Sequence, residues 1–171
     1  MELRAYSTDT DELRKTFGCF PSGVTAICGL GDGVPMGMAA SSFTPVSLDP
    51  PLVSICVQNT SATWPVLRRL PRLGLSVLAE GQDQTCISLS RRVGDRFADV
   101  SWMSRSNGTV FVRGATAWLD CRIHDELVAG DHTIVLLQIC ALGGDPDTPP
   151  LVFHASRFRR LTGAATVGAQ Q

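Results

Sequence analysis

The segment from Met38 to Thr44 (MAASSFT) brings small and hydroxyl-bearing side chains together. Small side chains let a planar ring approach the backbone, and hydroxyls with exposed N–H groups satisfy phosphate or sugar oxygens without a net charge. A tight turn between strands, stabilised by Ser and Thr hydrogen bonds to their own backbone, explains the same residues. The residue types alone leave a ligand cradle and a turn open.

A second polar group consists of Asn59, Ser61 and Thr63, ahead of a predicted short helix with Pro65 in its first turn. Capping of that helix would account for one of the three side chains. Free N–H groups at a helix N-terminus also attract anions, so the cluster fits a phosphate contact. Arg68 and Arg69 could contribute to it, although exposed helical arginines need no ligand.

A third feature is the sequence Gly130-Asp131-His132-Thr133, which precedes an apolar, strand-like run. Gly and Asp favour a turn that could hold the imidazole at the mouth of a site. A purely structural, hydrogen-bonding histidine is the alternative. His154 and Phe158 near the last predicted strand share this ambiguity, whereas His124 is expected to be merely exposed.

The elements that must position these residues are mostly short strands. Leu52–Gln58 is apolar on both faces, which predicts a central strand. Alternation in residues 115–127 places Asp120 on the polar face and Cys121 on the apolar face. Strands are expected within residues 23–30, 52–58, 72–80, 115–127, 130–142 and 150–158. Helices are expected at Asp9–Phe20 and within residues 59–70 and 81–97. A loop containing Trp102 is expected between Gly94 and Gly108.

Many short strands and two or three short helices indicate a mainly β fold, a barrel or a sandwich with helical additions. Strands do not alternate with long helices, so a doubly wound Rossmann sheet is not expected. The sequence also lacks GxGxxG after a strand, GxxxxGK[ST] and GxSxG. It has no CxxC pair and no His at metal spacing, so no metal site is predicted.

The composition suits one domain, with 171 residues of which 44% are hydrophobic and only 18% charged. So little charge suggests that some surface is buried in a homo-oligomer. A net charge of −1 argues against nucleic acid and anionic membranes as partners. The first residues have no apolar signal core, no run approaches membrane-spanning length, and the six cysteines suit reduced thiols, so we expect a cytoplasmic protein.

Four blocks of the sequence resemble the short-chain flavin reductases, the small reductase components of two-component flavin-dependent monooxygenases. The resemblance extends over about Phe17 to Leu161, with Asp95–Phe97 (DRF) and Pro150–His154 (PLVFH) fitting as well. The blocks are FGCFPSGVTAI (17–27), PMGMAASSFTPVSLDPPLVSICV (35–57), LSVLAEGQ (75–82) and GATAWLDCRIHDELVAGDHTIVLLQI (114–139).

The resemblance implies a split β-barrel of the Greek-key, FMN-binding type, in a single domain over residues 1–161 with an N-terminal helix. Residues 162–171 are then expected to form a flexible tail. It further implies a homodimer that reduces FAD or FMN with NADH or NADPH and supplies reduced flavin to a separate monooxygenase. FAD and NADH are the preferred pair, the latter because no arginine cluster accompanies the GDHT sequence.

The resemblance also implies roles for individual residues. His132 would lie near the nicotinamide, with Phe158 as a stacking wall. Flavin contacts would come from Met38, Ala39, Ala40, Ser41, Ser42, Val46, Ser47, Asn59, Ser61, Thr63, Ala79 and Gln84, of which Asn59, Ser61 and Thr63 meet the phosphate end. Many relatives carry Thr at the position of Ala39, Ser at that of Pro45 and often Tyr at that of Phe158. Without the hydroxyl at position 39, one hydrogen bond to the edge of the flavin ring is lost here.

Two alternatives to a reductase remain open on the sequence. One is a non-catalytic flavin carrier or sensor, which would bind flavin without flavin-dependent oxidation of NADH. The other is a split-barrel oxidase acting on a pyridoxine phosphate, which should offer more basic residues to the phosphate. Hydride transfer needs little acid–base chemistry from the protein, which explains why no catalytic dyad stands out.

Overall fold

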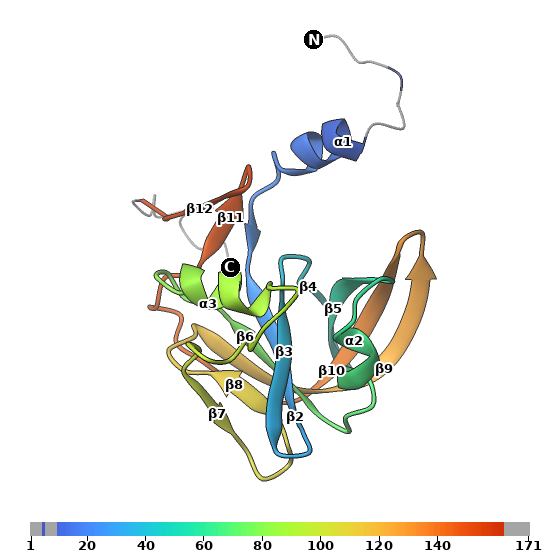
Figure 1. Cartoon of the computed structure of the whole chain (residues 1–171), viewed down its shortest axis with the longest axis vertical. Coiled ribbons are helices and arrows are strands. Elements are labelled where there is room, and N and C mark those ends of the chain that lie inside the picture. Colours follow the sequence, from blue (N-terminus) through green and yellow to red (C-terminus); the bar gives the residue numbers. More distant parts are fainter. Residues whose placement is uncertain (1–4, 6–9, 163–171) are drawn as a thin grey trace.

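The computed structural model describes residue 5 and residues 10–162. Its main feature is a seven-stranded antiparallel sheet with two small sheets beside it (Figure 1). The large sheet contains β2 (Thr25–Gly31), β3 (Val34–Ala40), β4 (Thr44–Leu48), β5 (Pro51–Gln58), β6 (Leu73–Val77), β9 (Ala117–Ala129) and β10 (His132–Gly144), in the order β3-β2-β6-β9-β10-β5-β4. The small sheets are β1 (Ser22–Gly23) with β11 (Val152–His154) and β12 (Arg157–Arg159), and β7 (Trp102–Ser104) with β8 (Val110–Val112).

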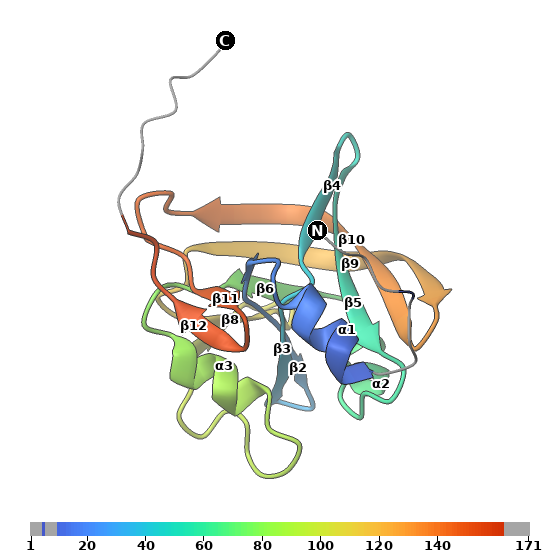
Figure 2. The same ribbon diagram turned by 90° about the horizontal axis from the view of Figure 1, so that it is seen from above.

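The long β9–β10 hairpin joins two halves of the large sheet (Figure 2). β6 pairs with β9 over Ala117–Cys121, near the open end of the hairpin. β5 pairs with β10 over His132–Gln138, near its tip. One apolar cluster contains Ile55 of β5 and Leu137 of β10 together with Ile27 of β2 and Leu75 of β6, so both halves share it, and a second cluster contains Leu78 and Leu89. The sheet is therefore split, with different partners at the two ends of one hairpin.

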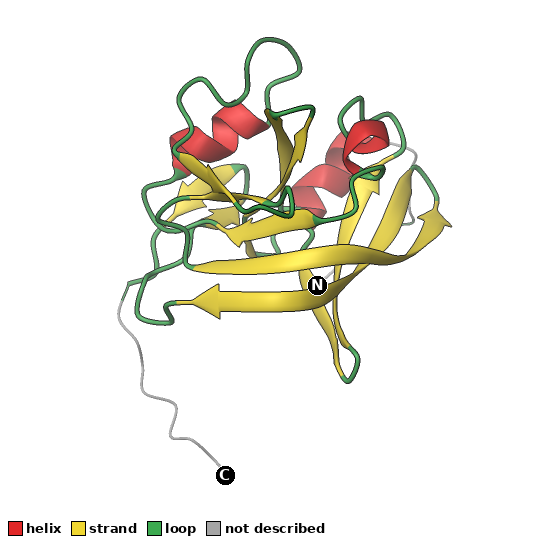
Figure 3. Ribbon diagram, turned by 90° about the horizontal axis from the view of Figure 1, so that it is seen from below, coloured by secondary structure: helices red, strands yellow, loops and turns green. Residues whose placement is uncertain are grey.

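Three helices of the described chain, α1 (Thr10–Phe17), α2 (Trp64–Leu67) and α3 (Asp83–Leu89), lie on one side of the β9–β10 hairpin (Figure 3). The predicted N-terminal helix is confirmed over Thr10–Phe17, while Asp9 lies outside the described residues. α1 buries none of its side chains, and the Ala155 N–H donates to the Gly18 carbonyl (2.9 Å) just beyond it. None of the described helices has the length and apolarity needed to cross a membrane.

Two predictions about local structure were wrong. The expected loop around Trp102 contains β7, which pairs with β8, because the apolar Val110–Val112 is fully buried and holds its partner. The single strand expected over residues 150–158 folds back as β11 and β12. Ala155 and Ser156 form that turn with φ of 48° and 58°. This is a left-handed conformation that Ala and Ser do not favour, so their residue types do not predict it.

The central position of Leu52–Gln58 is confirmed, since β5 lies between β10 and β4. Only one of its faces is fully in the core: Val53, Ile55 and Val57 are buried, whereas Cys56 and Gln58 are exposed. Residues 163–171 of the expected flexible tail lie outside the described residues, and Thr162 is exposed.

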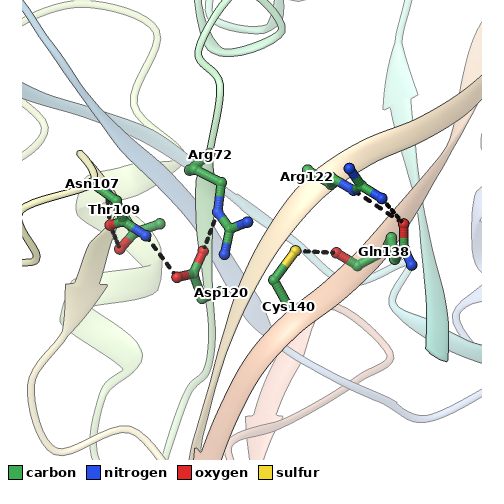
Figure 4. A network of polar contacts seen from close by, with 7 residues as sticks. All are labelled: Arg72, Asn107, Thr109, Asp120, Arg122, Gln138 and Cys140. Atoms are coloured by element: carbon green, nitrogen blue, oxygen red, sulfur yellow. Dashed lines mark hydrogen bonds and ion pairs between the residues drawn. The ribbon is translucent and has the colours of Figure 1, made fainter.

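Asp120 lies on the polar face of β9, as predicted, but its own side chain is buried and held by polar partners (Figure 4). Its carboxylate is bonded by Arg72 Nε (2.9 Å) and Asn107 Nδ2 (2.8 Å), and its side chain is 4% exposed. Burial by itself raises the pKa of Asp120, but the hydrogen bonds from Arg72 and Asn107 outweigh it and hold the pKa below its usual value. The buried carboxylate is thus paired with the Arg72 guanidinium, and this ion pair ties the loop before β6 to β9.

Candidate functional site

A cavity of about 580 Å³ lies where the end of β3 faces the outer side of β5. The segment before α2 and the residues after α3 complete its walls. This size falls within the range of about 300–1,000 Å³ usual for small-molecule sites. The lining residues are Met38, Ala39, Ala40, Ser41, Ser42, Cys56, Val57, Gln58, Thr60, Ser61, Ala62, Thr63, Leu89, Ser90, Arg92, Arg96 and His132.

The first wall is the segment Met38–Ser42, which runs out of β3 into a bend and is not a tight turn. Ser42 bridges to β5: its Oγ accepts the Cys56 N–H (2.8 Å) and donates to the Cys56 carbonyl (3.1 Å). One hydroxyl thus replaces a backbone pair and fixes the wall against β5. Ser41 is exposed and its hydroxyl has no hydrogen bond among the described residues, so it is free to meet a ligand.

Gly37 of β3 packs closely against β2, and its carbonyl helps to hold a guanidinium at this wall. A Cβ there would lie 2.5 Å from Cys28 Sγ and 2.9 Å from the Ile27 carbonyl, so only glycine fits. The Gly37 carbonyl accepts a hydrogen bond from Arg96 Nη1 (3.0 Å), and the same nitrogen donates to Thr63 Oγ1 (2.7 Å). Arg96 is thereby fixed at the cavity wall between β3 and α2.

The arginines of the site differ from those singled out in the sequence. Arg96 and Arg92 line the cavity, whereas Arg68 pairs with Glu126 (2.6 Å) outside it. None of the described lining residues is acidic. The family resemblance included Asp95–Phe97 but implied no role for it. This motif contains Arg96, so it could have pointed to the arginine at the cavity wall. Two guanidiniums without a lining carboxylate make the cavity suited to an anion.

Of the second polar cluster, Ser61 and Thr63 line the cavity and Asn59 does not. Ser61 Oγ accepts the Trp64 N–H (3.1 Å) at the start of α2. Asn59 is used within the fold: its Nδ2 donates to the Gly130 carbonyl (3.1 Å) and its Oδ1 accepts from Thr133 Oγ1 (2.9 Å). It therefore fixes the turn that carries the histidine.

His132 pairs with Gln58 across β10 and β5 and lines the cavity. Its Nδ1 lies 2.7 Å from Asp131 Oδ1. The hydrogen bond from His132 lowers the pKa of Asp131, so the carboxylate is ionised near neutral pH and can only accept. In the neutral imidazole the proton therefore sits on Nδ1, and Nε2 can accept a hydrogen bond from a ligand.

The remaining predicted contacts do not line this cavity. Val46 and Ser47 lie on the edge strand β4, and Gln84 lies exposed on α3. Ala79 is buried in a bridge to Pro150. Phe158 packs on Phe153 (ring centroids 5.4 Å apart), against the buried cluster that includes Leu89 and on which Ala39 also packs. Lining residues that the sequence did not single out are Cys56, Val57, Gln58, Thr60, Ala62, Leu89, Ser90, Arg92 and Arg96.

The described residues contain no cluster of three or more His, Cys, Asp or Glu side chains that could hold a metal ion. What the cavity offers instead is a wall of small residues, hydroxyls, two guanidiniums and one oriented imidazole. This arrangement can bind a flat ligand with an anionic end, and it supplies orientation and electrostatic attraction.

Comparison with known proteins identifies the family. The family model for the flavin reductase like domain matches residues 17–162. An NADH-dependent FAD reductase of Streptomyces globisporus is 39% identical over 165 residues, 94% of this chain and 90% of that protein. The reductase subunit HsaB of a flavin-dependent monooxygenase of Rhodococcus jostii is 33% identical over 167 residues, 98% and 86% of the two chains.

Solved structures agree in fold. The NADH:FAD oxidoreductase of Streptomyces globisporus, in complex with NAD and FAD fragments, superposes with a TM-score of 0.89 at 37% identity, over 96% of this chain and 99% of that one. A nitrilotriacetate monooxygenase component B from Mycobacterium thermoresistibile gives 0.89 at 31% identity, over 95% and 92%. The split-barrel prediction is confirmed, and this chain belongs to the flavin reductase-like family.

Proposed function

We propose that the cavity binds the flavin of this NAD(P)H:flavin oxidoreductase, with the ring along Met38–Ser42 and the phosphate end at Thr63 and Arg96. One observation carries the assignment: Arg96 is bonded to Thr63 Oγ1 and the Gly37 carbonyl through one nitrogen, which leaves its other N–H groups for a ligand. A guanidinium held in this way recognises a phosphate at little cost in side-chain entropy.

The residues present fit a phosphorylated flavin. Ala39 and Ala40 place only methyl groups along the wall, so a flat ring can approach the backbone. The free hydroxyl of Ser41 can bond to ring or ribityl oxygens. Since Asn59 is used within the fold, we assign its predicted phosphate contact to Arg96, with Arg92 as a second positive charge at the rim.

His132 is the proposed contact for the nicotinamide. Its Nε2 can accept from the carboxamide N–H₂, because Asp131 holds the proton on Nδ1. Bound flavin and NADH supply the hydride chemistry themselves. The chain's residues orient the two rings and exclude water between them, which is the contribution that such cofactors require of a protein.

The product is reduced flavin for a separate oxygenase. Relatives that are reductase subunits of flavin-dependent monooxygenases support a monooxygenase as the partner. Transfer of a hydride from NADH to FAD is supported by the relatives that are described as NADH-dependent FAD reductases.

We also propose a cytoplasmic homodimer. Phe17 and Phe20 at the end of α1 are 68% and 77% exposed, and Leu48 at the tip of the β4–β5 hairpin is 96% exposed, so a second copy has apolar surface to cover. All six cysteines are free thiols, as expected in a reducing compartment.

The experiment that tests the function follows NADH absorbance with and without added FAD. A reductase oxidises NADH only when flavin is present, in proportion to the flavin supplied. Flavin binding without NADH oxidation would instead identify a carrier or sensor.

A further inference from the structure

A second cavity, of about 310 Å³, adjoins the first and has no part in the site proposed above. The two share Val57, Gln58 and Ser61, so they are neighbours on either side of the segment that leads into α2. The second cavity lies where α2 approaches β9 and β10 near the tip of their hairpin (Figure 1).

The shape of this cavity is fixed by polar contacts at its base. Trp64 Nε1 donates to Glu126 Oε1 (3.0 Å), and Arg68 Nη2 donates to Glu126 Oε2. Because both carboxylate oxygens are used and the charge is neutralised by Arg68, Glu126 does not repel an electron-rich ligand. These contacts tie α2 to β9, so the cavity is already formed in the free chain.

The walls are apolar and the rim is polar. Pro65 and Trp64 of α2 line one side, and Val128 of β9, which is 73% exposed, lines the other. Gln58 stands at the boundary with the first cavity, and its side-chain amide has no hydrogen bond among the described residues. A slot with apolar faces and an unused amide at its edge matches the chemistry of a purine ring.

We propose that the second cavity binds the adenosine end of a dinucleotide whose reactive end occupies the first cavity. The inference rests on the proposed function. FAD and NADH share this chemistry, since each continues from a phosphate through a second phosphate and a ribose to adenine. From the Thr63–Arg96 phosphate position, the chain of such a ligand passes Ser61 to reach Pro65 and Val128.

The test compares Val128→Trp, which fills the slot, with Leu127→Trp, its matched control. Consecutive strand residues face opposite sides, and Leu127 is 64% exposed without lining the cavity. Dissociation constants of ADP, FAD and FMN are measured by calorimetry and flavin fluorescence, and KM for NADH is compared with KM for reduced nicotinamide mononucleotide. Melting temperatures of both variants show whether they are folded.

We expect Val128→Trp to weaken ADP binding by about tenfold or more, the loss of roughly 1.4 kcal/mol of contact, with Leu127→Trp near wild type. A rise in the ratio of the FAD to the FMN dissociation constant identifies the ligand as FAD. A rise in KM for NADH without a rise in KM for reduced nicotinamide mononucleotide identifies the ligand as NADH. Equal ADP affinity in all three proteins overturns the proposal.

The two proposals fail in different ways. If the chain were not a flavin reductase, FMN would not support NADH oxidation even in the wild type. If only the adenosine subsite were wrong, FMN and FAD would both support turnover, and Val128→Trp would leave the affinity for ADP unchanged.

Discussion

Replacing Arg96 by Met removes the guanidinium at the proposed phosphate position and keeps most of the aliphatic stem. A hydrogen bond to a charged group contributes about 1.5–3 kcal/mol, so we expect the dissociation constants of FMN and FAD to rise about 10- to 150-fold. Riboflavin lacks the phosphate, so its affinity should change by less than about threefold, the effect of roughly 0.6 kcal/mol.

The substitution also affects the fold, because Thr63 Oγ1 and the Gly37 carbonyl lose their donor. Two lost hydrogen bonds cost about 1–3 kcal/mol, a fall in Tm of roughly 2–9 °C for a chain of this length. Binding should therefore be measured well below the Tm of the variant, by quenching of flavin fluorescence.

The matched control is Arg69→Met. Arg69 is exposed at the end of α2 and does not line the cavity, so this variant removes one positive charge from the same region without touching the site. An equal loss of riboflavin and FMN binding in Arg96→Met would refute the reasoning, since the guanidinium would then act on the shape of the cavity. Unchanged FMN binding would refute it as well.

Three further predictions concern the nicotinamide contact, the buried carboxylate and the proposed dimer. His132→Ala should raise KM for NADH more than it changes flavin affinity, because the contact proposed for Nε2 is with the nicotinamide; steady-state kinetics with an unchanged KM would contradict this role. Asp120→Ala should lower stability by about 3 kcal/mol by leaving Arg72 without its carboxylate. Since the folded-state pKa of Asp120 is lowered, its contribution is present above the unfolded pKa of about 3.9 and is lost as pH falls through the folded value, so the Tm difference from wild type should shrink below about pH 4. Phe17→Ser with Phe20→Ser should convert a dimer of twice 18.3 kDa into monomers in light scattering, whereas an unchanged mass would show that the second copy covers another face.

Much of the fold could be predicted because its signals are local. Period-two alternation in β9, the apolar run of β5 and the breaks at Gly and Pro depend only on neighbouring residues. The β11–β12 turn could not be predicted, because Ala155 and Ser156 adopt a left-handed backbone that the fold imposes and their side chains do not favour. The partner of Asp120 was equally hidden, since Arg72 lies 48 residues away in the sequence.

In the candidate site, too, the residues with a local signal could be predicted and those whose role depends on distant partners could not. The sequence singled out Met38–Ser42 and His132, which line the cavity, because small residues and a Gly-Asp-His turn are visible along the chain. It did not find Arg96, whose meaning depends on a carbonyl from β3 and a hydroxyl from the start of α2. The family resemblance implied a ligand contact for Asn59, whose amide bonds to Gly130 and Thr133 in the structure.

By itself, the sequence determined a mainly β chain of split-barrel type, its resemblance to the flavin reductases and the segment along which a flavin ring could lie. Only the tertiary structure decided which polar side chains are free to meet a ligand. Ser42 and Asn59 are used within the fold, while Ser41 and Arg96 face the cavity with bonding capacity to spare. The reason is physical: residue type fixes what a side chain can bond, but its availability depends on partners that folding brings from distant parts of the chain.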